Sequence, residues 1–427
     1  MAGRQLLSQL GQEDIVLSGK PEITFFKEAY PAQGLYASRV IDVPFKNVPT
    51  FGEEVSTEIP LNGDLMTSMY VSFTFGVNQG FTFNAQAGLL MINYVELYSG
   101  NELIERLWGE YIGILNECQI PTSKQGAIAS IVGGGTPSTS FVPASYPFKF
   151  TVPLPFQCLK RGLPLVPNMN FRVSLNDPPS FLNGVVPPSI PTMQFNFYTE
   201  FVVLSEAEKN FIKNRGPVIY LGESIEMSQF SVTTQSANVR CVTDFLHPVK
   251  EIFFTIRNSS SSPPDYWFDY SNTAQGGTSS QYWSNTYSNI NHLNSMGMYF
   301  EGIRRVDPLW ATQIYLGTTQ FIDYHTRVPT RPFYMYSFSQ DPENLKPAGS
   351  VNLGRIKNQY FDFFLQPCPT GETHRTGSSL YGPDTIHSWR LTASRLSRTS
   401  LTERETMGTS CTCREGALKE NFRKVLK

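Results

Sequence analysis

The sequence is poor in charge. Asp, Glu, Lys and Arg make up 16% of its 427 residues, where soluble domains average roughly 25%. The formal net charge is only -2, so the chain as a whole lacks the basic excess that holds a protein on nucleic acid. Any contact with nucleic acid is therefore expected to be local.

Long apolar runs are missing as well. No stretch of about 18 uninterrupted apolar residues occurs, which argues against a membrane-spanning helix. The opening segment Met1 to Leu10 runs into Gln12, Glu13 and Asp14 before the core of a signal peptide forms. We expect a soluble protein that is not exported by the secretory route.

Cysteine and histidine are sparse. The six cysteines are irregularly spaced, which is typical of reduced thiols in a cytosolic compartment and not of a disulfide framework. The five histidines form no H-x-H or H-E-x-x-H motif, and Cys411-Thr412-Cys413 has no second pair to complete a metal site. Asp323 and His325 resemble an acid and base pair only through their spacing on a strand, without a nucleophile motif. We predict no catalytic, cofactor-binding or metal-ligating residue, and no small-molecule substrate.

Aromatic residues and strand patterns are abundant. Aromatics reach 13%, with 31 Phe and 20 Tyr, which favours a permanent assembly, although a large β protein has similar numbers. Apolar residues alternate with polar ones in three runs, a period of two that places one set on a buried sheet face. The apolar members are Met69, Val71, Phe73, Phe75 and Val77; Phe148, Phe150, Val152, Leu154 and Phe156; and Met193, Phe195 and Phe197. Pro153 and Pro155 favour an edge position or an early end for the second run. The chain is predicted to be all-β.

Helices are predicted at two places. The spacing of Ile104, Leu107, Tyr111 and Leu115 favours a helix over Leu103 to Glu117. Ser205 followed by Glu208 is a capping-box pattern at a second helix. A chain of this length predicts two or three domains, and we place the boundary at a short helical linker over residues 205–218.

Two long polar connections are expected to be loops. One runs from Thr122 to Tyr146 and includes Gly133 to Gly135, and the other runs from Asn258 to Gly297. Asn258-Ser259-Ser260 is an N-glycosylation sequon, which marks Asn258 as the one candidate modification site. A solvated turn is the alternative interpretation of Asn258, because a chain without a signal peptide does not meet the enzymes of the endoplasmic reticulum.

Two distant motifs resemble one family. Residues 19–27 read G-K-P-E-I-T-F-F-K, and residues 331–358 include R-P-F-Y-M-Y-S-F, D-P-E-N-L-K-P-A-G-S and G-R-I-K-N. Together they resemble the major capsid protein of large icosahedral nucleocytoplasmic DNA viruses. Five further segments are similar to the same family and follow the family's order along the chain: Ile92–Glu105, Pro153–Phe156, Gly162–Pro167, Phe171–Val173 and Leu246–Phe254.

The resemblance implies a double jelly roll, two tandem eight-stranded β-sandwiches with short helices in linker and loops. We divide the chain into an N-terminal arm (1–18), a first jelly roll (19–204), the linker helix (205–218), a second jelly roll (219–366) and a C-terminal tail (367–427). The family assembles as homotrimers with a pseudo-hexagonal outline that tile an icosahedral virion capsid. It implies assembly in the host cytoplasm and contacts with neighbouring capsomers and with minor capsid and penton proteins.

The tail departs from the family pattern after Gln366. From residue 367 onward it carries ten Lys and Arg against six Asp and Glu. Two interpretations are open: the tail is a divergent, inward-facing arm that completes the second jelly roll, or it is the product of a slipped reading frame. Its basic residues are candidates for contact with packaged DNA or an inner membrane, and a solvated tail is the alternative. They are Arg390, Arg395, Arg398, Arg404, Arg423, Lys424 and Lys427.

Three functions are compared. The first is a structural major capsid protein without enzymatic activity. The second is a minor capsid paralogue at special positions of the shell. The third is a glycan-binding β-sandwich protein that stacks sugars on the Tyr and Trp residues of the loop from 258 to 297.

Overall fold

The computed structural model describes residues 34–47, 49–76, 82–133, 147–183, 193–214, 218–233, 238–258, 291–344, 346–366 and 386–401, together with Gly11 and Tyr270. The predicted N-terminal arm apart from Gly11, the first family motif, most of the loop from 258 to 297 and the Cys411–Cys413 pair lie outside these residues. Within them, no helix is long and apolar enough to cross a bilayer.

The first β-sandwich is built from residues 36–204. One sheet has the order β1-β11-β3-β7 and the other the order β2-β9-β5-β6, and every neighbouring pair is antiparallel. The strands are β1 (Tyr36–Val43), β2 (Glu54–Glu58), β3 (Leu65–Phe75), β5 (Ile92–Ser99), β6 (Glu102–Trp108), β7 (Phe148–Pro153), β9 (Met169–Leu175) and β11 (Met193–Leu204). The short strands β4 (Thr82–Phe83) and β10 (Leu182–Asn183) pair with each other, and β8 (Leu163–Pro164) pairs with β3.

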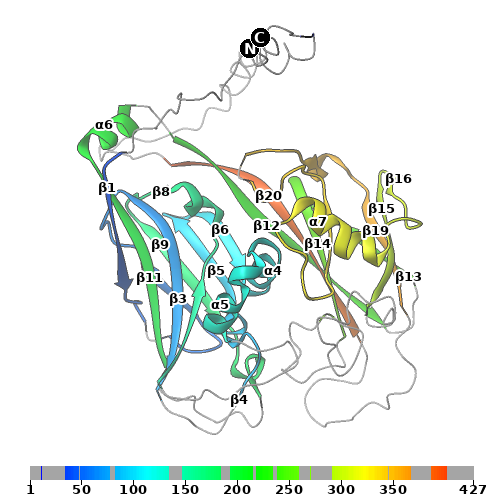
Figure 1. Cartoon of the computed structure of the whole chain (residues 1–427), viewed down its shortest axis with the longest axis horizontal. Helices are drawn as coiled ribbons and strands as arrows, with labels where there is room; N and C mark the ends of the chain where they lie inside the picture. The colour runs from blue at the N-terminus through cyan, green and yellow to red at the C-terminus, as the bar shows by residue number, and fades with distance from the viewer. Residues whose placement is uncertain are drawn as a thin grey trace, which may run out of the picture.

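The second β-sandwich repeats this topology. Its sheets have the orders β12-β20-β14-β17 and β13-β19-β15-β16. The strands are β12 (Val218–Thr233), β13 (Asn238–Thr243), β14 (Pro248–Asn258), β15 (Leu293–Phe300), β16 (Ile303–Val306), β17 (Tyr334–Ser337), β19 (Gln359–Leu365) and β20 (Ile386–Leu401), with β18 (Val351–Asn352) paired to β14. In both halves the main strands follow the order first-eighth-third-sixth and second-seventh-fourth-fifth. This is a jelly roll twice over, with the two sandwiches side by side (Figure 1), and the predicted double jelly roll is confirmed.

The runs of alternating apolar and polar residues predicted strands that the structure contains. In β3 the apolar side chains Met69, Val71, Phe73 and Phe75 are all buried. Phe150 and Val152 of β7 are buried too, and β7 lies at the edge of its sheet and ends at Pro153, where the ring removes a ladder donor. The prediction for this run is therefore confirmed.

The helix predicted over Leu103–Glu117 is wrong in its first half. Residues Glu102–Trp108 form β6, which pairs with β5 through a turn at Gly100, where φ is +60°. The helix α4 starts only at Gly109 and runs to Gln119. A Cβ atom on Gly109 would lie 2.1 Å from the carbonyl oxygen of Ile92, so the junction of β6 and α4 needs a glycine.

Both predicted loops are shorter than expected. Helix α5 (Thr122–Val132) occupies the first part of the segment predicted as a loop from 122 to 146, and it ends at Gly133, where φ is +109°. The second predicted loop, from 258 to 297, gives way to β15 at Leu293. The remaining helices among the described residues are α3 (Ala87–Leu90), α6 (Glu206–Asn214), α7 (Gln320–Tyr324), the π-helix η5 (Tyr315–Thr319) and the short 3-10 helices η1 (Gln157–Arg161), η2 (Pro178–Ser180) and η6 (Leu353–Arg355).

The predicted helix after Ser205 is confirmed as α6. The Glu208 backbone N–H donates to Ser205 Oγ at 3.4 Å, so the serine satisfies one of the free donors at the helix start. This helix lies between the last strand of the first sandwich and the first strand of the second.

The tail contributes a strand. β20 lies between β12 and β14 and pairs with both, from Thr233↔Ile386 to Val218↔Leu401 along β12. Its place in the second sandwich is that of β11 in the first, because each is the eighth main strand and separates the first from the third. Residues 386–401 therefore supply the eighth strand of the second jelly roll.

Candidate functional site: the junction between the two sandwiches

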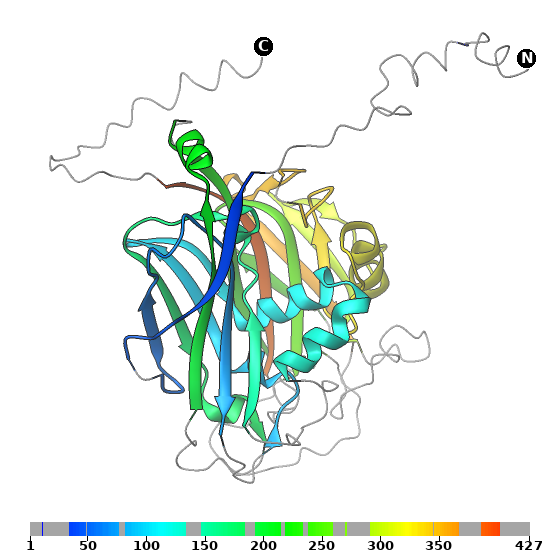
Figure 2. The same ribbon diagram turned by 60° about the vertical axis from the view of Figure 1, so that its left-hand side comes forward.

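The two sandwiches share a hydrophobic core. Phe253, Phe321, Phe333 and Met335 of the second half belong to the same buried cluster as the core of the first sandwich. A separate cluster fills the second sandwich and includes Cys241, Phe254 and Phe361. Helix α4 lies on the side of the first sandwich that faces the second (Figure 1; Figure 2 gives a second view).

Aromatic rings form the apolar part of this junction. Tyr111 of α4 meets the ring of Phe253 edge to face, with centroids 6.1 Å apart. Phe253 also packs against Phe321 and Phe333, which contact each other at 5.5 Å. All of these side chains are buried. Such pairs add about 0.5–1.5 kcal/mol each beyond the area that they bury, so the two halves are expected to behave as one rigid unit.

Glu117, at the end of α4, is the centre of a buried polar network. Its Oε2 atom accepts hydrogen bonds from Arg327 Nη2 at 2.8 Å and from the hydroxyl and the backbone N–H of Thr330 at 2.9 and 3.2 Å. Arg331 Nε lies 3.9 Å from Oε1. Arg327 also donates through Nε to the backbone carbonyl of Glu117 at 2.7 Å. The Glu117 carboxylate of the first sandwich thus fixes the loop from Arg327 to Arg331 of the second sandwich.

His325 bridges two carboxylates in the second sandwich. Its Nδ1 atom lies 2.9 Å from Glu343 Oε1 and its Nε2 atom 3.0 Å from Glu251 Oε2. Burial works against the charged ring, but the two carboxylates outweigh burial and raise the pKa of His325 to about 9. The imidazolium therefore donates to both carboxylates at neutral pH. Thr326 adds two hydrogen bonds to Glu343, which fixes the loop that follows α7.

A buried ion pair lies across the first sheet of the second sandwich. Lys250 of β14 donates to Glu223 of β12 and to the backbone carbonyl of Pro342. Both charged side chains are buried, and burial raises the pKa of Glu223 although Lys250 opposes the shift. A pair of this kind is costly to break because the remaining charge has no water around it.

Glu105 is a buried carboxylate that forms no ion pair with any described residue. Its two oxygens accept the backbone N–H groups of Gln157 and Cys158 at 3.0 and 3.1 Å, which ties β6 to η1. Burial raises the pKa of Glu105 to about 7, against the opposing effect of these two donors.

The raised pKa of Glu105 predicts a pH-dependent stability. A carboxyl group with a pKa of about 7 in the folded protein and 4.5 in the unfolded chain contributes stability that is fully present below about pH 4.5 and is lost as the pH rises through 7. Between pH 5 and 8 the loss is about 2–3 kcal/mol. Glu105→Gln is expected to remove this dependence, so urea unfolding of the two proteins at both pH values should give a smaller difference for the variant. If the free energy of unfolding changes equally between pH 5 and 8 in the wild-type protein and in the variant, Glu105 titrates with an ordinary pKa.

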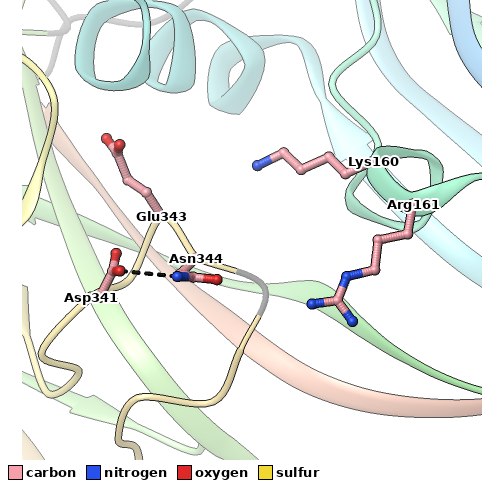
Figure 3. Close-up of a pocket in the computed structure, with 5 residues that line it drawn as sticks. All are labelled: Lys160, Arg161, Asp341, Glu343 and Asn344. Carbon is pink, nitrogen blue, oxygen red and sulfur yellow. Dashed lines mark hydrogen bonds between the residues drawn. The ribbon is translucent and has the colours of Figure 1, made fainter. Parts of the chain in front are cut away.

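A polar pocket opens at the same junction. It has a volume of about 500 Å³ and is lined by Lys160 and Arg161 of η1 and by Asp341, Glu343 and Asn344 of the loop after β17. In Figure 3 Lys160 and Arg161 extend toward the opposite wall, where Asp341 lies beside Asn344 and Glu343 points away from the two cations.

The residues singled out in the sequence, Asn258 and the pair Asp323 and His325, do not form a common site. Asn258 is the last residue of β14, at the mouth of the loop, and its register partner is His387. Asp323 lies in α7 and not on a strand, and the carboxylates at hydrogen-bond distance from His325 are Glu251 and Glu343, so the expected strand geometry for Asp323 and His325 is wrong. In the part of the chain that the structure describes, no group of three or more His, Cys, Asp or Glu is placed to hold a metal ion.

One predicted sugar-stacking residue is unavailable. Tyr270 is only 1% exposed, and its hydroxyl donates to Glu110 of α4 at 3.0 Å. Its ring packs against Phe333 with centroids 6.0 Å apart. Tyr270 is therefore packed into the junction and cannot present its ring to a glycan. The other aromatic residues of that loop lie outside the described residues.

Two family models match the chain. The model described as "Major capsid protein N-terminus" matches residues 24–176, and the model described as "Large eukaryotic DNA virus major capsid protein" matches residues 216–388. The chain belongs to this family of viral capsid proteins. The second match begins just after α6, which ends at Asn214. The function of the family is structural, and the chain is a capsid protein of an icosahedral DNA virus.

Relatives and solved structures agree with this assignment. The major capsid protein of Pyramimonas orientalis virus is 25% identical over 390 residues, which cover 83% of this chain and 90% of that protein. That of Paramecium bursaria Chlorella virus 1 is 25% identical over 403 residues, covering 86% and 89%. The VP54 structure of the same virus, fitted into a reconstruction of the virophage Sputnik, superposes with a TM-score of 0.72 at 18% identity, covering 89% of this chain and 98% of that one. The Faustovirus major capsid protein gives 0.69 at 10% identity, covering 92% and 94%.

Proposed function

We propose that three copies of this capsid protein close into a ring with a nearly hexagonal outline, and that these rings tile the shell next to minor capsid and penton proteins. Six sandwiches then stand around one threefold axis. The observation that carries the trimer is a pair of exposed apolar surfaces, one on each sandwich. Single exposed apolar residues are ordinary, but contiguous groups of them mark contact sites.

The first surface lies on β1, the edge strand of the first sandwich. It consists of Leu35, Tyr36 and Val40, and Leu35 is 80% exposed. Tyr36 and Val40 are four residues apart and lie on the same face of the strand. Among the described strands β1 has one neighbour, β11, which leaves its other edge available to a partner. We call this group the β1 surface.

The second surface lies on the second sandwich, around η5 and α7. It consists of Leu309, Trp310, Ile314 and Ile322, and Leu309 is 86% exposed. Trp310 is held edge to face against Tyr315 with centroids 4.8 Å apart, which fixes the orientation of its ring. β1 lies at one side of the molecule and α7 in the other half (Figure 1). We call this group the α7 surface.

Two different surfaces on one chain favour a head-to-tail contact. When the β1 surface of one copy meets the α7 surface of the next, every contact is of the same heterologous kind, and such contacts close into a ring when the rotation permits. A self-complementary contact of either surface alone would stop at a dimer. Two equal sandwiches per chain give three chains the six-part outline that packs in a plane.

Mixing two variants tests this contact. Tyr36→Asp with Val40→Asp disables only the β1 surface, and Leu309→Asp with Ile322→Asp disables only the α7 surface. Each variant alone is expected to be a monomer, because a carboxylate buried in an apolar contact loses its hydration. Since each keeps the surface that the other lacks, a one-to-one mixture is expected to give a dimer in analytical ultracentrifugation. Homodimers of either variant alone would mean that the contact is symmetric.

The proposal extends to the ends of the chain and to Asn258. Tyr36 pairs with Leu204 and Leu401 with Val218, so both described ends of the chain emerge beside α6. We place this end toward the interior, where the N-terminal arm and the basic tail reach an inner membrane or packaged DNA, and we assign assembly to the host cytoplasm.

Three further statements belong to the same proposal. The two jelly rolls are divided at residues 205–218, the protein has no enzymatic activity, and Asn258 is glycosylated. The strand 386–401 extends the second jelly roll beyond the boundary at 366.

A further inference from the structure

The pocket at the junction has walls of opposite charge. Lys160 and Arg161 belong to the first sandwich, and Asp341 and Glu343 to the second. The pocket lies toward the α6 end of the molecule, because β8, which directly follows η1, pairs with β3 at Leu65 and Met66, opposite the last residues of β11. This is the end at which both described chain ends emerge.

The opposite charges of the two walls are not in contact with each other. In the described ranges no ion pair joins Lys160 or Arg161 to a carboxylate across the pocket. Desolvation lowers the pKa of Lys160, and the nearby carboxylates of Glu223 and Glu343 oppose this shift without forming an ion pair with Lys160. Glu343 is already held by His325 and Thr326, whereas the one hydrogen bond that Asp341 accepts from a described residue is neutral, from Asn344 at 3.2 Å. Two cations and the Asp341 carboxylate are therefore left for a ligand.

The composition of the walls selects the ligand class. Small-molecule sites are mostly apolar and enclosed, whereas all five lining side chains here are polar or charged. A nucleic acid or lipid phosphate would satisfy Lys160 and Arg161 but would meet repulsion from Asp341 and Glu343. A polymer that carries both acidic and basic groups can pair with the cations of one wall and with the carboxylates of the other.

We propose that this pocket binds an extended polypeptide segment of another shell protein. An acidic side chain of the segment pairs with Lys160 and Arg161, and a basic side chain a few residues away pairs with Asp341. Because the walls belong to different sandwiches, the bound segment braces the junction from the interior side of the shell. The inference rests on the proposed capsid assembly, which places a second protein within reach.

Peptide binding to the full-length trimer tests the site. The probes are four fluorescent peptides of equal length, in which the repeating residues are alternating Glu and Lys, Glu only, Lys only, or Ser and Gly. Fluorescence anisotropy at physiological salt is expected to show about tenfold tighter binding of the alternating peptide than of the others. Lys160→Ser with Arg161→Ser should abolish this preference, and Asp341→Lys should shift it to the Glu peptide.

The matched control removes two exposed cations elsewhere. Lys46 and Arg172 are about half exposed and pair with Glu58 and Glu54 beside β2, so Lys46→Ser with Arg172→Ser should leave the alternating peptide bound as before. Equal binding of the four peptides, equal binding of the Glu and alternating peptides, or an equal loss in the control variant would each overturn the proposal. Light scattering on the same samples reports the trimer independently, so failure of the pocket is distinguishable from failure of the assembly.

Discussion

Glu117→Ala is expected to lower the free energy of unfolding by about 3–5 kcal/mol, because it breaks a buried ion pair. The substitution leaves Arg327 and Arg331, both buried, without the carboxylate that they share. It also removes the acceptor for the hydroxyl and the N–H of Thr330. Urea unfolding followed by tryptophan fluorescence measures the loss.

The matched control is Glu54→Ala. Glu54 pairs with Arg172 at 3.7 Å on the surface of the first sandwich, where both side chains are more than 40% exposed. Exposed pairs contribute about 0–1 kcal/mol, so the control should unfold almost like the wild-type protein. Similar losses in the two variants would show that Glu117 does not hold the two sandwiches together.

A truncation that removes β20 is expected to prevent folding of the second sandwich. Ending the chain after Thr385 removes the strand between β12 and β14, which leaves two long strands with open edges in one sheet. Open edges pair with other chains, so the product should be found in the insoluble fraction after expression. Ending the chain after Leu401 keeps β20 and serves as the control.

The two truncations also decide between the interpretations of the tail. If residues 386–401 form the eighth strand, only the longer product is soluble and gives the near-ultraviolet circular dichroism of the full chain. If both products are equally soluble and equally folded, the tail contributes nothing to the second sheet, as expected for a slipped reading frame.

The strands could be predicted because a strand with one buried face shows apolar and polar residues in alternation along the sequence. Phe73, Phe75 and Phe150 alternate with polar neighbours, and one buried face is enough to fix the strand and its register. The helix α6 was predictable for the same reason, since Ser205 and Glu208 lie within one turn. The double jelly roll itself came from the resemblance, because the two halves show their common topology only in the order of their strands.

The errors arise where distant partners outweigh local preference. Ile104 and Leu107 fit a helical spacing, but the turn at Gly100 pairs Glu105 with Leu97 and Leu107 with Val95, and this hairpin fixes a strand. Helix α5 has little amphipathic pattern because only Val132 at its end is buried. A helix that is exposed on nearly all sides leaves no periodic signal.

The junction could not be predicted from the sequence. Glu117 and Arg327 are 210 residues apart and carry no motif. His325 was noticed through its neighbour Asp323, yet its partners are Glu251 and Glu343, which other strands and loops bring to it.

The mass of the purified chain in solution tests the account most directly. Size-exclusion chromatography with multi-angle light scattering is expected to give three times the chain mass of 48.0 kDa, with the Tyr36→Asp, Val40→Asp variant at a single chain mass. A wild-type protein that stays monomeric at high concentration would contradict a capsid protein whose paired sandwiches close in threes.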